Sequence, residues 1–345
     1  EEAGVRRAHD IALINRKRLV IIVDEAHRDT FGKMLRVIKE TFPAAIFFGF
    51  TGTPIHRENS KHRSTTSTVF GNELHRYSIA DGIRDRNVLG FDPCMVTTFR
   101  DSDVRLAVAL HKAKAKDIAQ ALANPAKAAV YNRYMNAALV PMAGFEQEGG
   151  TYVKGIEDDL PDAQYETEQH RRLVAEDILR GWVRLSRNGK FHAIFATASI
   201  AEAIAYYRLF KAMGSALHIT ALFDPNIDNN GNGMDKEDGL IEILEDYNGR
   251  YGQAFDIAGH ARFKKDVAAR LAHKEPYQRV EQTPERELDL LIVVDQMLTG
   301  FDSKWVNTLY LDKVLKYENI IQAFSRTNRL FGPDKPFGTI RYYRR

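Results

Sequence analysis

Residues 19–27 read LVIIVDEAH: five consecutive aliphatic residues, then two carboxylates, an alanine and a histidine. An apolar run of this length is typical of a strand that is buried on both faces in the middle of a parallel sheet. Open α/β sheets bind their ligands at the carboxyl ends of the strands, which is where Asp24, Glu25 and His27 fall. The stretch predicts an α/β fold with a functional edge, although a strand followed by a solvated acidic turn would also explain it.

A second apolar run, residues 44–50, follows one βαβ unit after the first, and an amphipathic helix is predicted between them over residues 30–40. Because the two strands are then parallel, their carboxyl ends lie on the same edge of the sheet. The turn TGTP at residues 51–54 is therefore expected beside the two carboxylates. Alone it would be read as a polar loop, but its place after DEAH favours a role for Thr51, Gly52 and Thr53 at the same edge.

The paired acids suit phosphoryl transfer. This chemistry needs one carboxylate near the Mg²⁺ that bridges the phosphates, and a second group that orients the attacking water. Asp24 fits the first role and Glu25 fits the second.

The composition is that of an ordinary globular protein, with 44% hydrophobic and 28% charged residues among 345. This length suffices for two α/β domains, and the net charge of +3 is too small to diagnose a nucleic-acid binder. One cysteine, Cys94, excludes a disulfide framework and a thiolate zinc site and suits a reducing cytoplasm. No apolar run approaches the roughly 20 residues that a membrane span needs, so a cytoplasmic protein is expected.

The second half of the chain predicts another α/β unit. Strands are expected at 190–196, 217–223, 288–294 and 306–312, and helices at 200–213 and 261–273. Between the strands lies an acidic stretch, 224–246, which is read as a solvent-exposed insertion. Its spacing resembles a calcium-binding EF-hand loop, but Asn226 and Gly233 occupy positions where that loop needs an aspartate and an aliphatic residue.

Two stretches of this half carry candidate site residues. Thr197 and Ser199 precede a predicted helix, where they could contact a nucleic-acid phosphate or simply cap the helix. A helix predicted over 319–330 places Gln322, Arg326 and Arg329 at i, i+4 and i+7, on one face. Two guanidinium groups presented together can clamp a γ-phosphate and stabilise its transition state, whereas a solvated basic face is the alternative.

The motifs DEAHR, TGTP, MLTGFD, LYLDK and QAFSRTNR, in this order, resemble the motor (R, or restriction) subunit of type I restriction–modification enzymes, which are superfamily 2 helicase-like translocases. The resemblance covers most of residues 19–345. It implies two RecA-like parallel-sheet helicase domains: the C-terminal half of the first at 1–100 and the second at 181–345. Residues 101–180, which carry no recognisable chemistry, would form a helical connector or insertion.

The resemblance also implies roles for individual residues. Asp24 would hold Mg²⁺ beside ATP, and His27 would link the nucleotide site to the neighbouring domain. Thr51, Gly52 and Thr53 would couple hydrolysis to domain movement. Gly300, Asp302 and Gln322 would contact the nucleotide or couple it to DNA, and Thr299 would lie near a DNA phosphate. Arg326 and Arg329 would act as arginine fingers. The implied partners are double-stranded DNA, bound through its backbone, and the methyltransferase and specificity subunits of a type I complex.

Two features of that family are missing from the sequence: a GxxxxGK[ST] phosphate-binding loop and the nuclease set of an aspartate followed by Glu-x-Lys. We therefore expect a fragment that does not turn over ATP alone, with both features upstream of Glu1. Another superfamily 2 translocase of repair or defence is an alternative. So is a catalytically silent DNA-binding module, although the intact Asp24, Glu25, Arg326 and Arg329 argue against silence.

Overall fold

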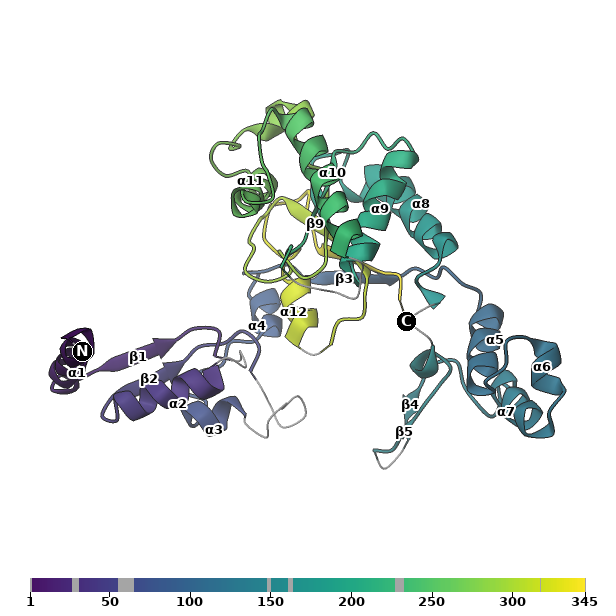
Figure 1. Cartoon of the computed structure of the whole chain (residues 1–345), viewed down its shortest axis with the longest axis horizontal. Coiled ribbons are helices and arrows are strands. Elements are labelled where there is room, and N and C mark those ends of the chain that lie inside the picture. Colours follow the sequence, from purple (N-terminus) through teal and green to yellow (C-terminus); the bar gives the residue numbers. More distant parts are fainter. Residues whose placement is uncertain are drawn as a thin grey trace. The chain divides into compact units, whose positions relative to one another are not determined.

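The computed structural model describes residues 2–26, 31–54, 65–147, 150–160, 164–226, 233–316 and 318–344. The chain divides into two compact units (Figure 1). The first unit consists of residues 1–85 and 315–322, and the second of residues 86–314 and 323–345. Each unit is described by itself below.

The first unit contains one small parallel sheet. Its elements are α1 (Glu2–Asn15), β1 (Val20–Val23), α2 (Phe31–Thr41), β2 (Ile46–Gly49), α3 (Thr66–Phe70) and α4 (Ile79–Arg84). The strands pair in parallel, with Val20 opposite Ile46 and Val23 opposite Gly49. Leu35 of α2 packs against Val23 and closes a small core on one face of the sheet. The predicted βαβ unit is therefore confirmed.

The expectation that the first strand is buried on both faces is wrong. Val23 is buried, but Val20 is 53% exposed and Ile22 is 68% exposed. Successive side chains of a strand point to opposite faces, and α2 packs against the face of Val23. The exposed side chains of Ile46 and Phe48 on β2 lie opposite Val20 and Ile22, so in the part of the chain that the structure describes this face of the sheet is not covered.

The second unit is built on a six-stranded sheet in the order β3-β10-β9-β6-β8-β7, and every neighbouring pair is parallel. The strands are β3 (Phe91–Met95), β6 (His192–Thr197), β7 (Ile219–Leu222), β8 (Leu290–Val293), β9 (Val306–Asp312) and β10 (Gly338–Tyr342). All residues of β6, β8 and β9, three of the four inner strands, are buried, as expected of strands inside a parallel sheet. The expected α/β class with parallel sheets is confirmed.

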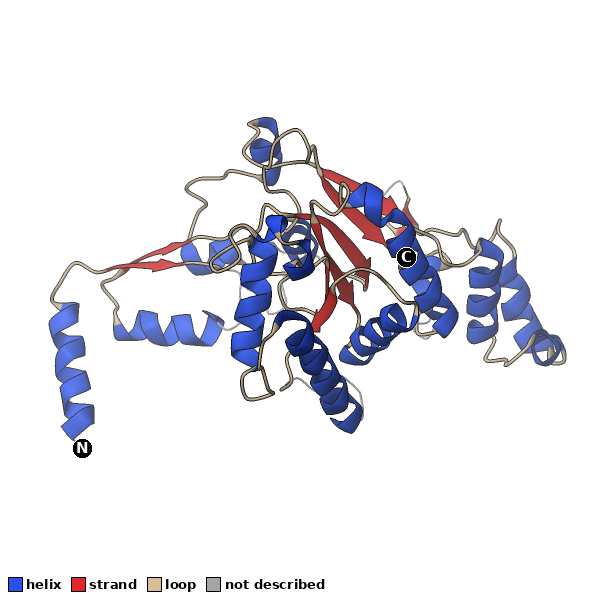
Figure 2. Cartoon of the chain, turned by 90° about the horizontal axis from the view of Figure 1, so that it is seen from above, coloured by secondary structure: helices blue, strands red, loops and turns tan. Residues whose placement is uncertain are grey.

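Helices pack on this sheet (Figure 2). They are α8 (Glu168–Leu185), α9 (Ile200–Ala212), α10 (Gly233–Tyr251) and α11 (His260–Ala272), with 3₁₀ turns at Glu157–Asp159, Val280–Gln282 and Pro284–Arg286. Helix α9 contacts β6, β7 and β8, and both α8 and α10 pack against α9. Helix α12 (Glu318–Phe324) begins in the first unit and ends in the second.

Helix α10 corrects the interpretation of residues 224–246 as an acidic exposed insertion. From Gly233 onward this stretch is helical, and Leu240, Ile243, Leu244 and Tyr247 are buried at helical spacing. The abundant acidic residues hide this apolar stripe in the sequence. Of the calcium-loop candidates, Asp228, Asn230 and Gly231 lie outside the described residues.

Residues 101–160 form a helical segment within the second unit. Figure 1 shows α5 (Asp101–Lys112), α6 (Ile118–Leu122) and α7 (Pro125–Met135) packed together, followed by the hairpin β4 (Phe145–Glu146) and β5 (Tyr152–Val153). Strand β3, which was expected in the first domain at 1–100, pairs with β10 in the second unit. The division therefore falls after residue 85 rather than at residue 100. Among the described helices, none is both long and apolar enough to cross a membrane.

Candidate functional site

The carboxylates Asp24 and Glu25 lie at the carboxyl end of β1, beside the turn that follows β2. The amide of Phe50 donates to the carbonyl of Val23 at 2.8 Å, and the amide of Ala26 donates to the carbonyl of Phe50 at 2.9 Å. These bonds join the two strand ends, as the βαβ spacing predicts. Both carboxylates are exposed. His27, the third candidate of the motif, lies outside the described residues.

Glu25 has a backbone conformation that is rare for its residue type. Its φ of 52° is in the left-handed region, and its amide donates to Oδ1 of Asp24 at 2.8 Å. A residue other than glycine in this region is uncommon and is typical of turns whose geometry serves a function. The turn thus presents two carboxylates from consecutive positions in a defined arrangement.

The turn at 51–54 is tied to helix α12. The amide of Thr53 donates to Thr51 Oγ1 at 3.1 Å, and Gln322 Nε2 donates to Thr53 Oγ1 at 3.2 Å, all within the first unit. Thr53 is 8% exposed, whereas Gly52 is exposed. The predicted coupling role of Thr51, Gly52 and Thr53 stays a prediction. The predicted contact of Gln322 with a nucleotide stays a prediction.

In the second unit the loop after β8 meets the turn after α12. Arg326 donates to the carbonyl of Phe301, and Arg329 Nε forms an ion pair with Asp302. Gly300 has a φ of 68° and bends the loop just before these contacts, while Thr299 is exposed beside it. The structure therefore brings together four of the residues that were predicted separately: Gly300, Asp302, Arg326 and Arg329.

The predicted helix over 319–330 is too long. Helix α12 ends at Phe324, and residues 325–327 form a turn in which Arg326 N bonds to Ala323 O at 3.1 Å and Thr327 N to Phe324 O at 2.9 Å. The next residues are buried: Thr327 is 0% exposed and Asn328 is 2% exposed. Gln322, Arg326 and Arg329 therefore do not share a helical face, and that prediction is wrong.

Thr197 and Ser199 both bond to the protein's own backbone. Thr197 is 0% exposed, and its Oγ1 lies 3.2 Å from the carbonyl oxygens of Val293 and Ser199. Ser199 is the N-cap of α9, because its Oγ accepts a hydrogen bond from the amide of Glu202 at 3.2 Å. The capping alternative thus holds for Ser199. A contact of either residue with DNA stays a prediction.

Asp312 forms a buried network that sequence reasoning missed. It ends β9, and its Oδ1 lies 2.9 Å from His170 Nε2 and 2.8 Å from Arg344 Nε, while Tyr206 donates to Oδ2 at 2.8 Å. Burial raises the pKa of Asp312, but hydrogen bonds from His170 and Arg344 outweigh this effect and the net shift is downward. The one signal in the sequence is a carboxylate at the end of an apolar strand.

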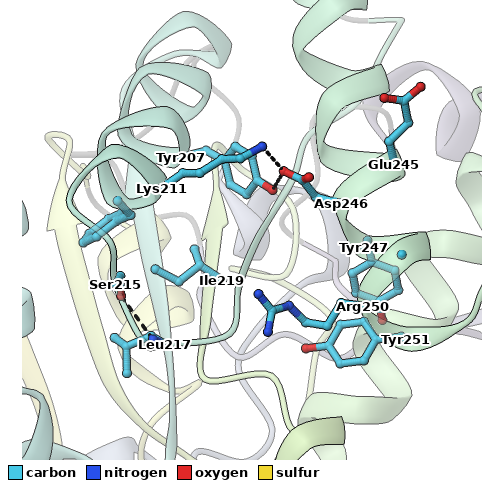
Figure 3. Close-up of a pocket in the computed structure, with 12 residues that line it drawn as sticks. Tyr207, Lys211, Ser215, Leu217, Ile219, Glu245, Asp246, Tyr247, Arg250 and Tyr251 are labelled. Carbon is cyan, nitrogen blue, oxygen red and sulfur yellow. Dashed lines mark hydrogen bonds and ion pairs between the residues drawn. The ribbon is translucent and has the colours of Figure 1, made fainter.

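A pocket lies elsewhere, beside the edge strand β7 (Figure 3). Its volume is about 510 Å³, and Lys211 of α9 forms an ion pair with Asp246 of α10 across it at 2.6 Å. Arg250 and Tyr251 line the same pocket. None of the predicted site residues lines it.

A magnesium site fits Asp24 only in part. In the described residues, no group of three or more His, Cys, Asp or Glu side chains could hold a metal ion. Mg²⁺, however, is commonly held by one or two carboxylates together with phosphates of a nucleotide. The exposed Asp24 can supply one such ligand.

Two family models match the chain. The model of type I restriction enzyme subunit R domain 3 matches residues 189–345, and the SWI2/SNF2 ATPase model matches residues 4–126. The first covers most of the second unit, including the loop and turn with Asp302 and Arg329. The second includes both carboxylates and the turn at 51–54.

Curated relatives match nearly the whole chain. The SauMSSORF170P type I restriction enzyme endonuclease subunit of Staphylococcus aureus (strain MSSA476) is 32% identical over 349 residues, which is 98% of this chain and 32% of the relative. The HindI endonuclease subunit of Haemophilus influenzae is 25% identical over 333 residues, 92% of this chain and 26% of the relative. A solved fragment of an HsdR subunit from Vibrio vulnificus YJ016 has a TM-score of 0.45 at 16% identity, covering 94% of this chain and 43% of that one. The chain spans about a third of the length of the first of these relatives.

Proposed function

The chain belongs to the family of type I restriction enzyme R subunits, and we propose that it forms the motor part of such a subunit, an ATPase that translocates double-stranded DNA. The observation that best supports this is the contact between the loop after β8 and the turn after α12. There Arg329 pairs with Asp302 and Arg326 is held by the Phe301 carbonyl. A structural ion pair would not require a second arginine on the same loop.

The proposed chemistry is hydrolysis of ATP. Mg²⁺, held by Asp24 and the nucleotide phosphates, would neutralise charge on the phosphates. Glu25 orients the attacking water, and the left-handed turn fixes where its side chain begins. Arg326 and Arg329 stabilise the negative charge of the transition state. The side chain of Arg329 is 41% exposed in its pair with Asp302, so it is accessible to an incoming phosphate.

The proposed partners follow from the same family. Double-stranded DNA would be bound through its backbone, with Ser199 and Thr299 as candidate contacts, because the side chain of Thr197 is buried. Gly300 and Asp302 would couple these contacts to the nucleotide. Thr51 and Thr53, tied to Gln322, would transmit hydrolysis to the helix that joins the units. DNA cleavage would reside in a nuclease domain outside these residues, and the methyltransferase and specificity subunits would complete a cytoplasmic complex.

The test uses the full-length subunit that contains this sequence. DNA-stimulated phosphate release should fall about 10³-fold or more in Arg329→Ala, because an arginine finger supplies about 10³- to 10⁵-fold in rate. Glu25→Gln should cause a loss of similar size, because the attacking water would no longer be oriented. Arg36→Ala, which removes an exposed arginine of α2 that pairs with Glu40, is the matched control and should leave the rate unchanged. Full activity in Arg329→Ala would contradict the assignment. DNA binding without ATP turnover by the unmodified subunit would favour the silent DNA-binding module.

A further inference from the structure

Lys335 is a buried lysine that binds only backbone carbonyls. Its side chain is 0% exposed, and its Nζ donates to the carbonyl of Val306 at 2.7 Å and to that of Lys304 at 3.0 Å. Within the described residues it forms no ion pair with a carboxylate. Its own amide bonds to Gly332 O at 3.1 Å, in the turn that follows Arg329.

These bonds join the two segments that carry Asp302 and Arg329. The first segment runs from Asp302 to Val306 and is also fixed by Ser303, whose Oγ donates to Leu271 O at 2.8 Å and accepts from Trp305 N at 3.0 Å. The second runs from Arg329 to Lys335. The Arg329–Asp302 pair connects the segments at one end, and Lys335 connects them at the other.

The burial of this ammonium group is unfavourable. Burial and, to a smaller extent, the charge of Arg329 lower the pKa of Lys335 to about 7, and the charge of Asp302 opposes them. Lys335 is therefore electrostatically coupled to both members of the ion pair. An apolar side chain of similar length would fill the same space without the desolvation penalty. The buried charge of Lys335 costs stability, yet its hydrogen bonds hold the segment that carries Asp302. A functional role explains this combination more easily than a structural one.

We propose that Lys335 is a positioning residue for hydrolysis: by holding the carbonyls of Lys304 and Val306, it fixes the segment that presents Asp302 and so orients Arg329 toward the phosphate. This inference rests on the proposed function. It predicts a defect in the chemical step rather than in nucleotide binding, because no atom of Lys335 is exposed to a ligand.

The experiment compares Lys335→Met with Lys190→Met in the full-length subunit. We expect kcat for DNA-stimulated ATP hydrolysis to fall about 10- to 100-fold in Lys335→Met, the size of effect that a misplacement of about 1 Å produces. The Kd of a non-hydrolysable ATP analogue should stay within about threefold, because Lys335 does not contact the nucleotide. A tenfold change in Kd would correspond to about 1.4 kcal/mol of binding free energy. Lys190 pairs with Asp334 in the turn beside Lys335 without contacting the carbonyls, so its removal should leave both values unchanged.

A double-mutant cycle with Asp302→Ala separates positioning from general destabilisation. If Lys335 acts through Asp302, the fold-loss of kcat in the double variant is smaller than the product of the two single losses. Independent effects on the fold would multiply, so that their free energies add. Emission of Trp305, which lies between the two bound carbonyls, should also change in Lys335→Met. If that variant does not fold, Lys335→Gln keeps a neutral N–H donor and provides the same readouts.

The outcomes are distinct. Wild-type kcat in Lys335→Met, or fully additive losses in the cycle, would overturn the positioning role while Arg329→Ala still supports the proposed function. A full-length wild-type subunit without ATPase activity would overturn both.

Discussion

Arg270 in α11 shows how the second unit accommodates a fully buried charge. The side chain is 2% exposed, and its guanidinium lies between the rings of Tyr251 and Tyr277, at 3.8 Å and 4.1 Å from their centroids. Asp266 lies 3.3 Å away, and Tyr247 and the carbonyl of Arg286 accept further hydrogen bonds. Only a planar guanidinium can stack and donate in this way at the same time.

We expect Arg270→Met to lower the free energy of unfolding by about 3 kcal/mol or more, because Asp266 would lose its buried partner. Arg270→Lys should recover little of this loss, since an ammonium cannot reproduce the fork. Urea denaturation of the isolated chain measures the change, with the exposed Arg36→Ala as the control expected within about 0.5 kcal/mol. An Arg270→Met variant as stable as the wild type would show that the aromatic contacts alone hold this region.

A second residue-scale prediction concerns pH. His192 and His273 are buried with their Nε2 atoms 2.7 Å apart, and His273 Nδ1 lies 3.1 Å from Glu281. One ring must donate and the other accept, so protonation of the accepting Nε2 breaks the bond. Burial first, and then the charge of His273, lowers the pKa of His192 to about 3. Because the unfolded histidine has a pKa near 6.5, the unfolded state binds more protons between these values, and stability falls as the pH falls through this window.

The expected loss is about 2 kcal/mol between pH 6.5 and pH 5. His192→Gln retains a donor without titrating, so its stability should depend less on pH than that of the wild type. Glu287, whose pKa burial raises to about 7, contributes the opposite slope and is present in both proteins. Urea midpoints at the two pH values give the comparison. Equal pH dependence in the two proteins would rule out His192 as the group responsible.

The residues of the candidate site differ in how far sequence could predict them. Asp24, Glu25 and the turn at 51–54 follow apolar strands one βαβ unit apart, so a local pattern suffices to place them together. Asp312 also ends a strand, but no local pattern predicts its partners, and Lys335 has no such pattern at all. Their partners, His170 and the carbonyl of Lys304, are distant along the chain and become neighbours only when the sheet is assembled.

At the level of elements, strands were easier to predict than helix ends. Strand β8 and the centre of β6 are continuous apolar runs, which are typical of a buried parallel strand. Helix α10 was missed because its acidic residues suggested a solvated loop, although the stripe at 240, 243, 244 and 247 has helical spacing. Helix α12 was predicted too long, because the chain leaves the helix through a turn after Phe324 and the carbonyl of Asn328 accepts a hydrogen bond from the distant amide of Leu89, which no local pattern predicts.

Two glycines of α10 provide a matched test of how this helix packs. A Cβ at Gly239 would lie 2.6 Å from Ile204 Cδ1 of α9, whereas nothing lies within 4 Å of a Cβ at Gly249. Gly239→Ala should therefore destabilise the chain by about 1–3 kcal/mol through overpacking. Gly249→Ala should stabilise it by up to about 1 kcal/mol through helix propensity. Thermal unfolding of both variants measures this, and equal effects would mean that α9 and α10 are not in close contact.

At the level of the whole molecule, the proposed DNA contacts go to phosphates rather than bases. Binding of duplex DNA by this chain should therefore be insensitive to sequence and should weaken steeply with salt. Fluorescence anisotropy with two unrelated duplexes, each titrated at low and at physiological salt, measures both properties. A strong preference for one duplex that persists at high salt would contradict this picture.

The uncovered face of the β1–β2 sheet has a consequence for the behaviour of the chain in solution. Val20, Ile22, Ile46 and Phe48 are each between 38% and 68% exposed. Water beside such hydrocarbon is released whenever a second apolar surface approaches, and strands with free edges offer backbone partners as well. The protein concentration at which the molecules begin to associate then depends on these four side chains. The net charge of +3 opposes such association only weakly.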